Sequence, residues 1–318
     1  MTEPELYAAV DIGTNSTRLL VCSVTQPADG GRPQIADLER HSTVTRLGDG
    51  VDSTGTLSAE AMERVLTVLE DYRKVIDLYP VRQPTGVLTS AGRDAANGQD
   101  LCDQILDRTG IQVRLIGGDE EANLSFSGAT SEVSADGRTL LVVDVGGGST
   151  ELITGSVGHV AFHTSLDAGV VRHSERYLHS DPPTAAELAE AATEITSLLA
   201  ATVPLEVRES VDACIAVAGT ATTLSAIDQE LEPYDPNRVH GATVDFERSQ
   251  QILDRIASLP LSERREVAGL HPDRAPTAVA GAVILCEVLD FFELDEFEAS
   301  EHDILRGEVL RSLTSQSP

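Results

Sequence analysis

Lysine is nearly absent from this chain of 318 residues. Lys74 is the only one, and 23 basic residues stand against 52 acidic ones, which gives a formal net charge of −29. A chain with this charge repels nucleic acids and anionic membranes at long range, because both are polyanions. The composition therefore predicts no nucleic-acid partner and no membrane partner. It still allows a small anionic substrate that is complexed with a metal and held by short-range donors.

Cysteine is sparse, and long apolar runs are missing. Cys22, Cys102, Cys214 and Cys286 are widely separated and form no C-x-x-C pair, so we expect buried, reduced thiols instead of a disulfide framework. No stretch reaches the roughly 18 apolar residues of a membrane helix. The opening MTEPELYAAV has no basic segment before its apolar run. We therefore expect a soluble cytoplasmic protein.

Several nucleotide and hydrolase motifs are also missing. The sequence has no G-x-x-x-x-G-K-[ST], which excludes a P-loop NTPase, and no G-x-S-x-G nucleophile elbow. The glycines at 146–148 are not followed by the last glycine of the G-x-G-x-x-G dinucleotide-binding motif. His159 and His163 have no further ligand at zinc spacing. These absences leave the glycine-rich segments as the places to look for chemistry.

The length suggests two domains at roughly 100–200 residues each, and an internal repeat supports this. Residues 11–21 read DIGTNSTRLLV, and residues 144–154 read DVGGGSTELIT. Aligned without gaps, they share Asp, Gly, Ser, Thr and Leu, and each lies between two apolar runs. Each copy predicts a strand, a tight glycine turn and a second strand. Two copies predict two similar domains that face one another across a cleft.

The remaining patterns are typical of an α/β protein. Apolar residues at helical spacing predict a helix over 57–79, and a Thr184-x-x-Glu187 capping box begins another. We further expect strands over 85–89, 111–116 and 214–217, a loop over SAGRDAAN, a helix from Asp119, a buried helix over 275–289 and a closing helix over 300–313.

The two glycine turns have the composition of an anion-binding site. Glycine permits tight turns in which successive N–H groups point at an anion, and the Ser and Thr hydroxyls add donors. An Asp at the end of the preceding strand can hold a divalent cation that bridges a bound phosphate. One such turn is also explained as a plain structural hairpin. Two matched turns favour a ligand with several phosphates.

The two copies differ in charge, which predicts different roles. Arg18 in the first copy stands where Glu151 stands in the second. We expect Arg18 to grip phosphate and Glu151, with Asp144, to help hold a metal or water. Alone, Glu151 is equally explained as a solvated strand residue.

Asp119, Glu120 and Glu121 open the helix that follows Gly117 and Gly118. Acidic residues in a first turn complement the helix dipole without any catalytic role. They also suit a general base, because phosphoryl transfer to water needs a carboxylate that orients and deprotonates the nucleophile. The pattern does not choose between the glutamates. Arg93, in a glycine-flanked segment after a strand, is either a surface residue or a phosphate clamp.

A series of segments in one order carries a family resemblance. In chain order they are DIGTNSTRLL, RLGDG, TSAGRDAAN, GGDEEA, DVGGGSTEL, AGVVRHSERY, AGTATTLSAI, VHG and GLHPDRAPTAVAGAVIL. Together they resemble the Ppx/GppA phosphatases, exopolyphosphatases and guanosine pentaphosphate phosphohydrolases within the acetate/sugar kinase–actin superfamily. The resemblance implies two similar actin-like (ribonuclease H-like) α/β domains with an active-site cleft between them. It places the first over 1–125, completed by a C-terminal helix over 300–318, and the second over 126–299.

The resemblance also implies roles for individual residues. It makes Glu121 the base, and Asp144 and Glu151 catalytic residues and ligands of Mg²⁺ or Mn²⁺. The residues that it implies for phosphate binding are Asp11, Gly13, Thr14, Asn15, Ser16, Arg18, Arg93, Gly146, Gly147, Gly148 and Ser149.

The chain resembles the short, actinobacterial members, which lack a C-terminal helical HD-like domain. Asp303 stands where many members carry Gly. The missing domain leaves grip on long chains and processivity open. A homodimer is the expected assembly by resemblance.

The expected activity is Mg²⁺-assisted hydrolysis of the terminal phosphate of inorganic polyphosphate, with Glu121 activating the water. Guanosine pentaphosphate is the alternative substrate. A sugar or acetate-type kinase and a non-catalytic sensor of polyphosphate or an alarmone are the rival functions.

Overall fold

The computed structural model describes residues 4–27 and 31–315. Its internal contacts divide the chain into two compact units, Met1–Gly128 with Ile304–Pro318, and Ala129–Asp303. The boundaries expected from the sequence differ from these by a few residues at each junction. None of the helices in the described part of the chain has the length and apolar character that crossing a membrane requires.

The first unit is built on a five-stranded mixed sheet with the order β3-β2-β1-β4-β5. The first three strands are antiparallel, and β4 and β5 continue from β1 in parallel. The strands are β1 (Glu5–Ile12), β2 (Ser16–Thr25), β3 (Gln34–Val44), β4 (Thr85–Leu88) and β5 (Gln112–Leu115). The helices are α1 (Val51–Thr54), α2 (Ala59–Ile76), α3 (Ser90–Asp94), α4 (Gly98–Thr109), α5 (Gly118–Ala129) and α14 (Ile304–Ser315).

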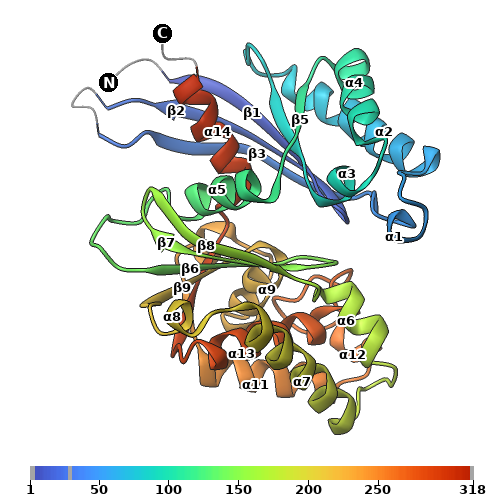
Figure 1. The fold of residues 1–318 in the computed structure, drawn as a ribbon, viewed down its shortest axis with the longest axis vertical. Coiled ribbons are helices and arrows are strands. Elements are labelled where there is room, and N and C mark those ends of the chain that lie inside the picture. Colours follow the sequence, from blue (N-terminus) through green and yellow to red (C-terminus); the bar gives the residue numbers. More distant parts are fainter. Residues whose placement is uncertain (1–3, 28–30, 316–318) are drawn as a thin grey trace. The chain divides into compact units, whose positions relative to one another are not determined.

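The two faces of this sheet carry separate cores, because successive strand residues point to opposite sides. Ala8 and Val10 pack with the buried residues of α2 and α4. Tyr7 and Ala9 on the other face pack with Leu305 of α14. In Figure 1, α14 lies along the sheet on the side away from α2 and α4. Helix α14 thus covers one face of the sheet that β1 and β2 help to form.

The second unit has a six-stranded sheet with the order β10-β11-β9-β6-β7-β8. One large core joins Leu141 and Val143 of the sheet to Ile195, Ile252 and Leu285 of its long helices (Figure 1). The strands are β6 (Leu140–Val145), β7 (Thr150–Ser156), β8 (His159–Leu166), β9 (Ala213–Val217), β10 (Thr243–Asp245) and β11 (Glu296–Ser300). The helices are α6 (Val170–Tyr177), α7 (Ala185–Thr202), α8 (Leu205–Arg208), α9 (Ala218–Asp228), α10 (Pro236–Val239), α11 (Phe246–Ser258), α12 (Leu261–Arg264) and α13 (Ala278–Phe291).

The two sheets repeat one topology, as the sequence repeat predicts. In each, three antiparallel strands form a meander whose first strand, β1 or β6, also pairs in parallel with a later strand, β4 or β9. That later strand pairs in parallel with β5 or β11. β10 is an added edge strand of the second sheet. The strand–turn–strand units predicted from the two glycine segments are confirmed as β1–β2 and β6–β7.

Most expected elements form near their predicted places, with two corrections. The segment expected as a loop over SAGRDAAN contains the short helix α3, which begins directly after β4. The closing helix begins at Ile304 and not at residue 300, because Glu296–Ser300 forms β11 beside β9. In that strand Phe297 and Ala299 are buried at the two-residue spacing of a sheet face. The four cysteines are free thiols, and all are buried as expected.

His173 of α6 is a buried imidazole that the sequence did not single out. Its side chain is 1% exposed, its ring lies 5.0 Å from that of Tyr177, and neither ring nitrogen has a hydrogen-bond partner among the described residues. Burial, followed by the positive charges of Arg176 and Arg172, lowers its pKa from 6.5 to about 4. The folded protein therefore holds this ring neutral.

The lowered pKa predicts acid sensitivity. Between pH 6.5 and about 4 the unfolded chain binds a proton at His173 that the folded chain refuses, so the free energy of unfolding falls as the pH drops through this window. Between pH 7 and 5, wild type should lose on the order of 1–2 kcal/mol more than His173→Phe, which has no titrating nitrogen. Urea unfolding of both proteins at the two pH values measures this. An equal loss in both would show that His173 contributes nothing to the acid response.

Candidate active site

The first glycine turn joins β1 to β2 in the first unit. The Gly13 N–H donates to the Ser16 carbonyl at 3.0 Å, which closes the turn. Residues 45–48 support this turn, because the Gly48 N–H donates to the Thr14 carbonyl and the Thr45 N–H to the Asn15 carbonyl, both at 2.9 Å. A Cβ on Gly48 would lie 2.3 Å from the Thr14 methyl group, so this segment must be glycine to approach so closely.

The second glycine turn joins β6 to β7 in the second unit with the same closure. The Gly146 N–H donates to the Ser149 carbonyl at 2.9 Å. Its outer part is accessible, since a Cβ on Gly148 would meet no atom within 4 Å. The common closing bond confirms that residues 13–16 and 146–149 form the same local structure.

The two turns differ in charge because of the residue that lies opposite the aspartate near the end of the first strand. Asp11 pairs across the strands with Arg18, and Asp144 pairs with Glu151. Arg18 donates from Nε at 2.9 Å and Nη2 at 2.6 Å to Oδ2 of Asp11, which is 3% exposed. In the second copy two carboxylates occupy this directly opposed position, which is destabilising unless a cation or proton lies nearby.

Arg18 therefore forms an ion pair with Asp11 inside the first copy. Its expected contact with phosphate stays a prediction. In the first copy an arginine lies opposite the aspartate, whereas in the second copy a glutamate lies opposite it.

Hydroxyl groups hold Glu151. Ser149 Oγ donates to its Oε1 at 2.6 Å and Ser165 Oγ to the same atom at 2.9 Å. Carboxylate and hydroxyl oxygens are the ligands that Mg²⁺ and Mn²⁺ prefer. The donor set around Asp144 and Glu151 thus fits the divalent cation implied by the family resemblance.

Glu121 lies in the first turn of α5 with Arg93 beside it. Arg93 Nη1 donates to Glu121 Oε2 at 2.7 Å and approaches the Ile116 carbonyl at 3.4 Å. Burial raises the pKa of Glu121 above its usual value, against the lowering effect of Arg93. The charge of Asp11 raises this pKa further, and a hydrogen bond from Thr89 lowers it. A desolvated carboxylate with a raised pKa has the properties of a general base.

The packing also separates Glu121 from its neighbour Glu120. The Glu121 side chain is 19% exposed, whereas that of Glu120 is 41% exposed and points to Arg114. Of the two glutamates that sequence patterns left open, Glu121 is the one in the same electrostatic environment as Asp11 and Arg93.

Some polar groups of the site were not expected from the sequence. Ser90, the first residue of α3, shares a hydrogen bond of 2.7 Å with Thr14 of the first turn, and Thr89 reaches Glu121. Both follow β4, which runs parallel to β1, so the carboxyl ends of the two strands meet at one edge. Ser165 lies opposite Glu151 in the β7–β8 register. A sequence scan based on strand ends could have found Thr89, whereas Ser165 depends on the register.

Helix α6 supports the second turn from below. The N–H groups of Val170 and Val171 donate to the Gly146 and Gly147 carbonyls, each at 2.9 Å. A Cβ on Gly169 would lie 2.5 Å from backbone atoms of Gly147. The turn and the start of α6 therefore form one closely packed unit.

One group of three metal-ligand side chains occurs among residues 4–27 and 31–315, and it lies elsewhere in the second unit. It consists of Glu132, His240 and His302. His240 Nδ1 accepts the Glu301 N–H at 3.3 Å, so the neutral ring carries its proton on Nε2, which faces Glu132 Oε2 at 3.5 Å. The two imidazole centroids are only 3.8 Å apart, closer than two rings converging on one ion. This group is explained as a packed polar cluster.

Comparison with known proteins agrees with this geometry. The family model described as the Ppx/GppA phosphatase family matches residues 23–316. The chain belongs to the Ppx/GppA phosphatase family. This membership confirms the predicted resemblance, and it makes the chain a hydrolase acting on phosphoric anhydrides.

Individual relatives of this Ppx/GppA protein cover nearly its whole length. Exopolyphosphatase 2 of Mycobacterium tuberculosis is 37% identical over 315 residues, which are 95% of this chain and 97% of the relative. Guanosine-5'-triphosphate,3'-diphosphate pyrophosphatase of Vibrio atlanticus is 30% identical over 92% of this chain and 56% of the relative. The solved structure of the Aquifex aeolicus family member matches with a TM-score of 0.84 at 27% identity over 99% of both chains. The predicted fold of two actin-like α/β domains is thereby confirmed.

The close packing of Gly169 against the second turn of this Ppx/GppA protein predicts that a larger residue there disturbs the turn. Gly169→Ala should displace residues 146–148, because the added methyl group cannot fit 2.5 Å from the turn backbone. Since small misplacements of binding groups cost up to about 100-fold in rate, we expect the rate of phosphoric anhydride hydrolysis to fall at least about ten-fold. Steady-state rates and thermal melting measured together check this. Wild-type activity with an unchanged melting temperature would contradict it.

Proposed function

We propose that this protein is an exopolyphosphatase that removes the terminal phosphate of inorganic polyphosphate. The observation that carries the proposal is the half-buried Glu121 carboxylate, which lies 2.7 Å from Arg93 and whose pKa is raised by burial and by the charge of Asp11. In this proposal Glu121 is the base and Arg93 binds phosphate, at one end of the β1–β4 pair. The 37% identity to an exopolyphosphatase supports the choice of substrate.

The proposed reaction uses groups from both glycine turns. The N–H groups and hydroxyls of residues 13–16 and 146–149, with Arg93, hold the terminal phosphates. Glu121 accepts a proton from water, and the water oxygen bonds to the terminal phosphorus. The anhydride P–O bond breaks, and the shortened chain leaves as an anion.

Asp144 and Glu151 are the residues that would hold Mg²⁺ or Mn²⁺. Their opposed placement on β6 and β7 brings two hard oxygen ligands together, whereas Asp11 in the first copy lies opposite Arg18. When bound, such an ion neutralises phosphate charge and stabilises the leaving group. The Ser149 and Ser165 hydroxyls orient Glu151 for this role.

Guanosine pentaphosphate is the second candidate substrate, favoured by the relative from Vibrio atlanticus. The segment AGTATT, at the start of α9, offers polar groups for a nucleoside. Arg274 Nη1 donates there to the Gly219 carbonyl at 2.9 Å and to Thr223 Oγ1 at 3.0 Å. This reading keeps the same phosphate chemistry and changes only the leaving group.

The decisive experiment compares phosphate release from short polyphosphate, long polyphosphate, guanosine pentaphosphate and ATP, with Mg²⁺ and with EDTA. Glu121→Gln should lower kcat on the order of 100-fold or more while retaining substrate binding, because loss of a general base commonly costs 10²–10⁴-fold. Asp119→Asn is the matched control, since it also removes a carboxylate from the first turn of α5. It should keep near wild-type kcat.

The outcomes separate the rival functions. Equal losses in Glu121→Gln and Asp119→Asn would indicate a helix-dipole effect and no base. Binding of all four substrates without turnover would favour a sensor. Phosphate transfer from ATP only with a sugar or carboxylic acid present would favour a kinase, and preference for the pentaphosphate would assign the alternative substrate.

The raised pKa of Glu121 predicts the pH dependence. A base works when ionised, so kcat/KM should fall as the pH drops through a value above 4.5. Arg93→Gln removes the largest effect that lowers this pKa, so the acid limb should move to higher pH by about one unit or more. Using one substrate for both proteins cancels the titration of its phosphates. An unmoved limb, or a shift to lower pH, would contradict the role of Glu121.

A further inference from the structure

The first turn of α5 sends neighbouring carboxylates to different partners. Glu121 pairs with Arg93 at 2.7 Å, and Glu120 Oε1 pairs with Arg114 Nη1 at 2.5 Å. Successive residues on a helix point about 100° apart, because one turn contains 3.6 residues. Two ion pairs in these two directions fix both the position and the rotation of the turn.

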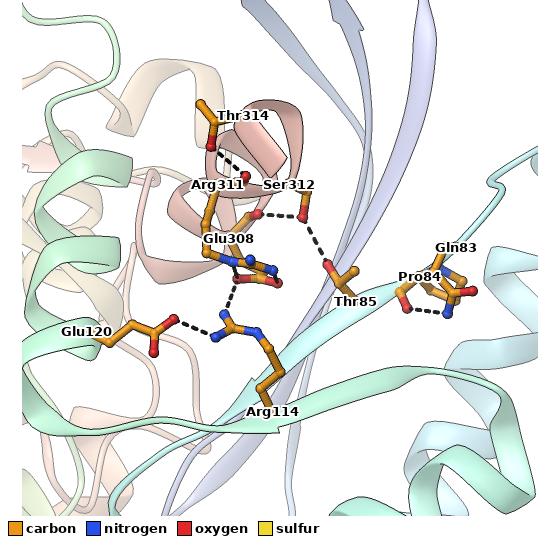
Figure 2. A network of polar contacts seen from close by, with 9 residues as sticks. All are labelled: Gln83, Pro84, Thr85, Arg114, Glu120, Glu308, Arg311, Ser312 and Thr314. Atoms are coloured by element: carbon orange, nitrogen blue, oxygen red, sulfur yellow. Dashed lines mark hydrogen bonds and ion pairs between the residues drawn. The ribbon is translucent and has the colours of Figure 1, made fainter. Parts of the chain in front are cut away.

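Arg114 is itself anchored on a buried group. It projects from β5, and its Nη2 donates to Glu308 Oε2 at 3.0 Å. The Glu308 side chain is fully buried, with 0% exposure, and Arg311 also binds it, through Nε and Nη2 at 2.8 Å each. Figure 2 shows the Arg114 guanidinium between Glu120 and the Glu308–Arg311 pair. Because a buried carboxylate is costly without hydrogen-bonded cations, both arginines are held firmly.

Helix α14, which carries Glu308, is in backbone contact with α5. A Cβ on Gly307 would lie 2.0 Å from the Leu124 carbonyl oxygen, so only glycine allows the two helices to cross this closely. Leu124 also packs in a small apolar cluster with Val87, Ile116 and Ile304. The C-terminal helix therefore gives α5 a fixed support.

We propose that Arg114, anchored by the buried Glu308, is a positioning residue that sets the orientation of Glu121 through its ion pair with Glu120. This inference rests on the proposed role of Glu121 as the base. Arg114 touches no reacting group. It connects the C-terminal helix to the turn that presents Glu121.

The chain offers a matched control for this role. Arg108 of α4 also bridges two carboxylates, with Nη1 at 2.7 Å from Glu63 and Nε at 2.8 Å from Glu70. Its side chain is 33% exposed, compared with 32% for Arg114. It contacts no residue of α5 in these interactions. Arg108→Gln thus removes an equivalent ion-pair bridge without affecting the support of Glu121.

The experiment measures kcat, KM and urea stability for Arg114→Gln, Arg114→Lys, Glu120→Gln and Arg108→Gln on short polyphosphate with Mg²⁺. Arg114→Gln should lower kcat about ten-fold or more with KM within about two-fold, since displacement of a base slows the chemical step. Arg114→Lys should recover part of this loss, because an ammonium group can reach one carboxylate but lacks the planar fork. Arg108→Gln should keep wild-type kcat.

Two further variants show whether Arg114 acts along the proposed route. Glu120→Gln should match Arg114→Gln, and the double variant should be no slower than either one. In a Glu121→Gln background, Arg114→Gln should cause no further loss of kcat. A further ten-fold loss there, or wild-type kcat in a folded Arg114→Gln protein, would overturn the proposal.

The design keeps the two proposals distinguishable. If Arg114→Gln does not fold, Glu120→Gln decides alone, because it leaves Glu308 paired with both arginines; wild-type kcat in that variant overturns the inference. If Glu121→Gln itself retains activity, the proposed function fails whatever Arg114 does. If Glu121→Gln is inactive and Arg114→Gln behaves like Arg108→Gln, only the positioning role fails.

Discussion

A glycine N–H that donates to a serine carbonyl three residues later is the constraint on which the candidate site depends. The bond closes the turn at Gly13–Ser16 and again at Gly146–Ser149. By folding the chain back at this point, it places Asp11 opposite Arg18 and Asp144 opposite Glu151. The strand-end aspartates thereby acquire fixed cross-strand partners. The backbone of each turn is held by a neighbouring segment that approaches closely through its own glycine, Gly48 or Gly169.

The two turns have the same backbone structure but different charge, because Arg18 lies opposite the aspartate in one and Glu151 in the other. Arg18 neutralises the buried Asp11, so the first copy is a closed ion pair. Glu151 opposes Asp144, so the second copy concentrates negative charge that suits a divalent cation. The two copies of the hairpin thus form sites of different charge. The desolvated Glu121 beside Arg93 adds the remaining component, a carboxylate whose proton affinity is raised by burial.

Much of the site could be predicted from local patterns, since the repeat, the turns and the acidic helix start are each contained in a short stretch of sequence. Other features could not. Thr89 and Ser90 reach the site because β4 pairs with β1, and Ser165 reaches Glu151 because β8 pairs with β7 in one register. The ion pair of Arg18 with Asp11 joins residues seven positions apart, and it depends on the pairing of β1 with β2. The segment after β4 contains the short helix α3 where a loop is expected, and Gly92 lets this helix pack against Leu88.

By itself, the sequence determined the two hairpins, the α/β class and the family, because these follow from residue types at short, fixed spacings. Only the tertiary structure shows how the surroundings of Glu120 and Glu121 differ. The two are chemically identical neighbours, and their difference arises from what lies around them. Arg114, which is anchored by the buried Glu308 of the last helix, pairs with Glu120, whereas Arg93 pairs with the less exposed Glu121. The pKa of a carboxylate depends on its burial and on nearby charges. Because these come from residues distant in the chain, packing determines the pKa.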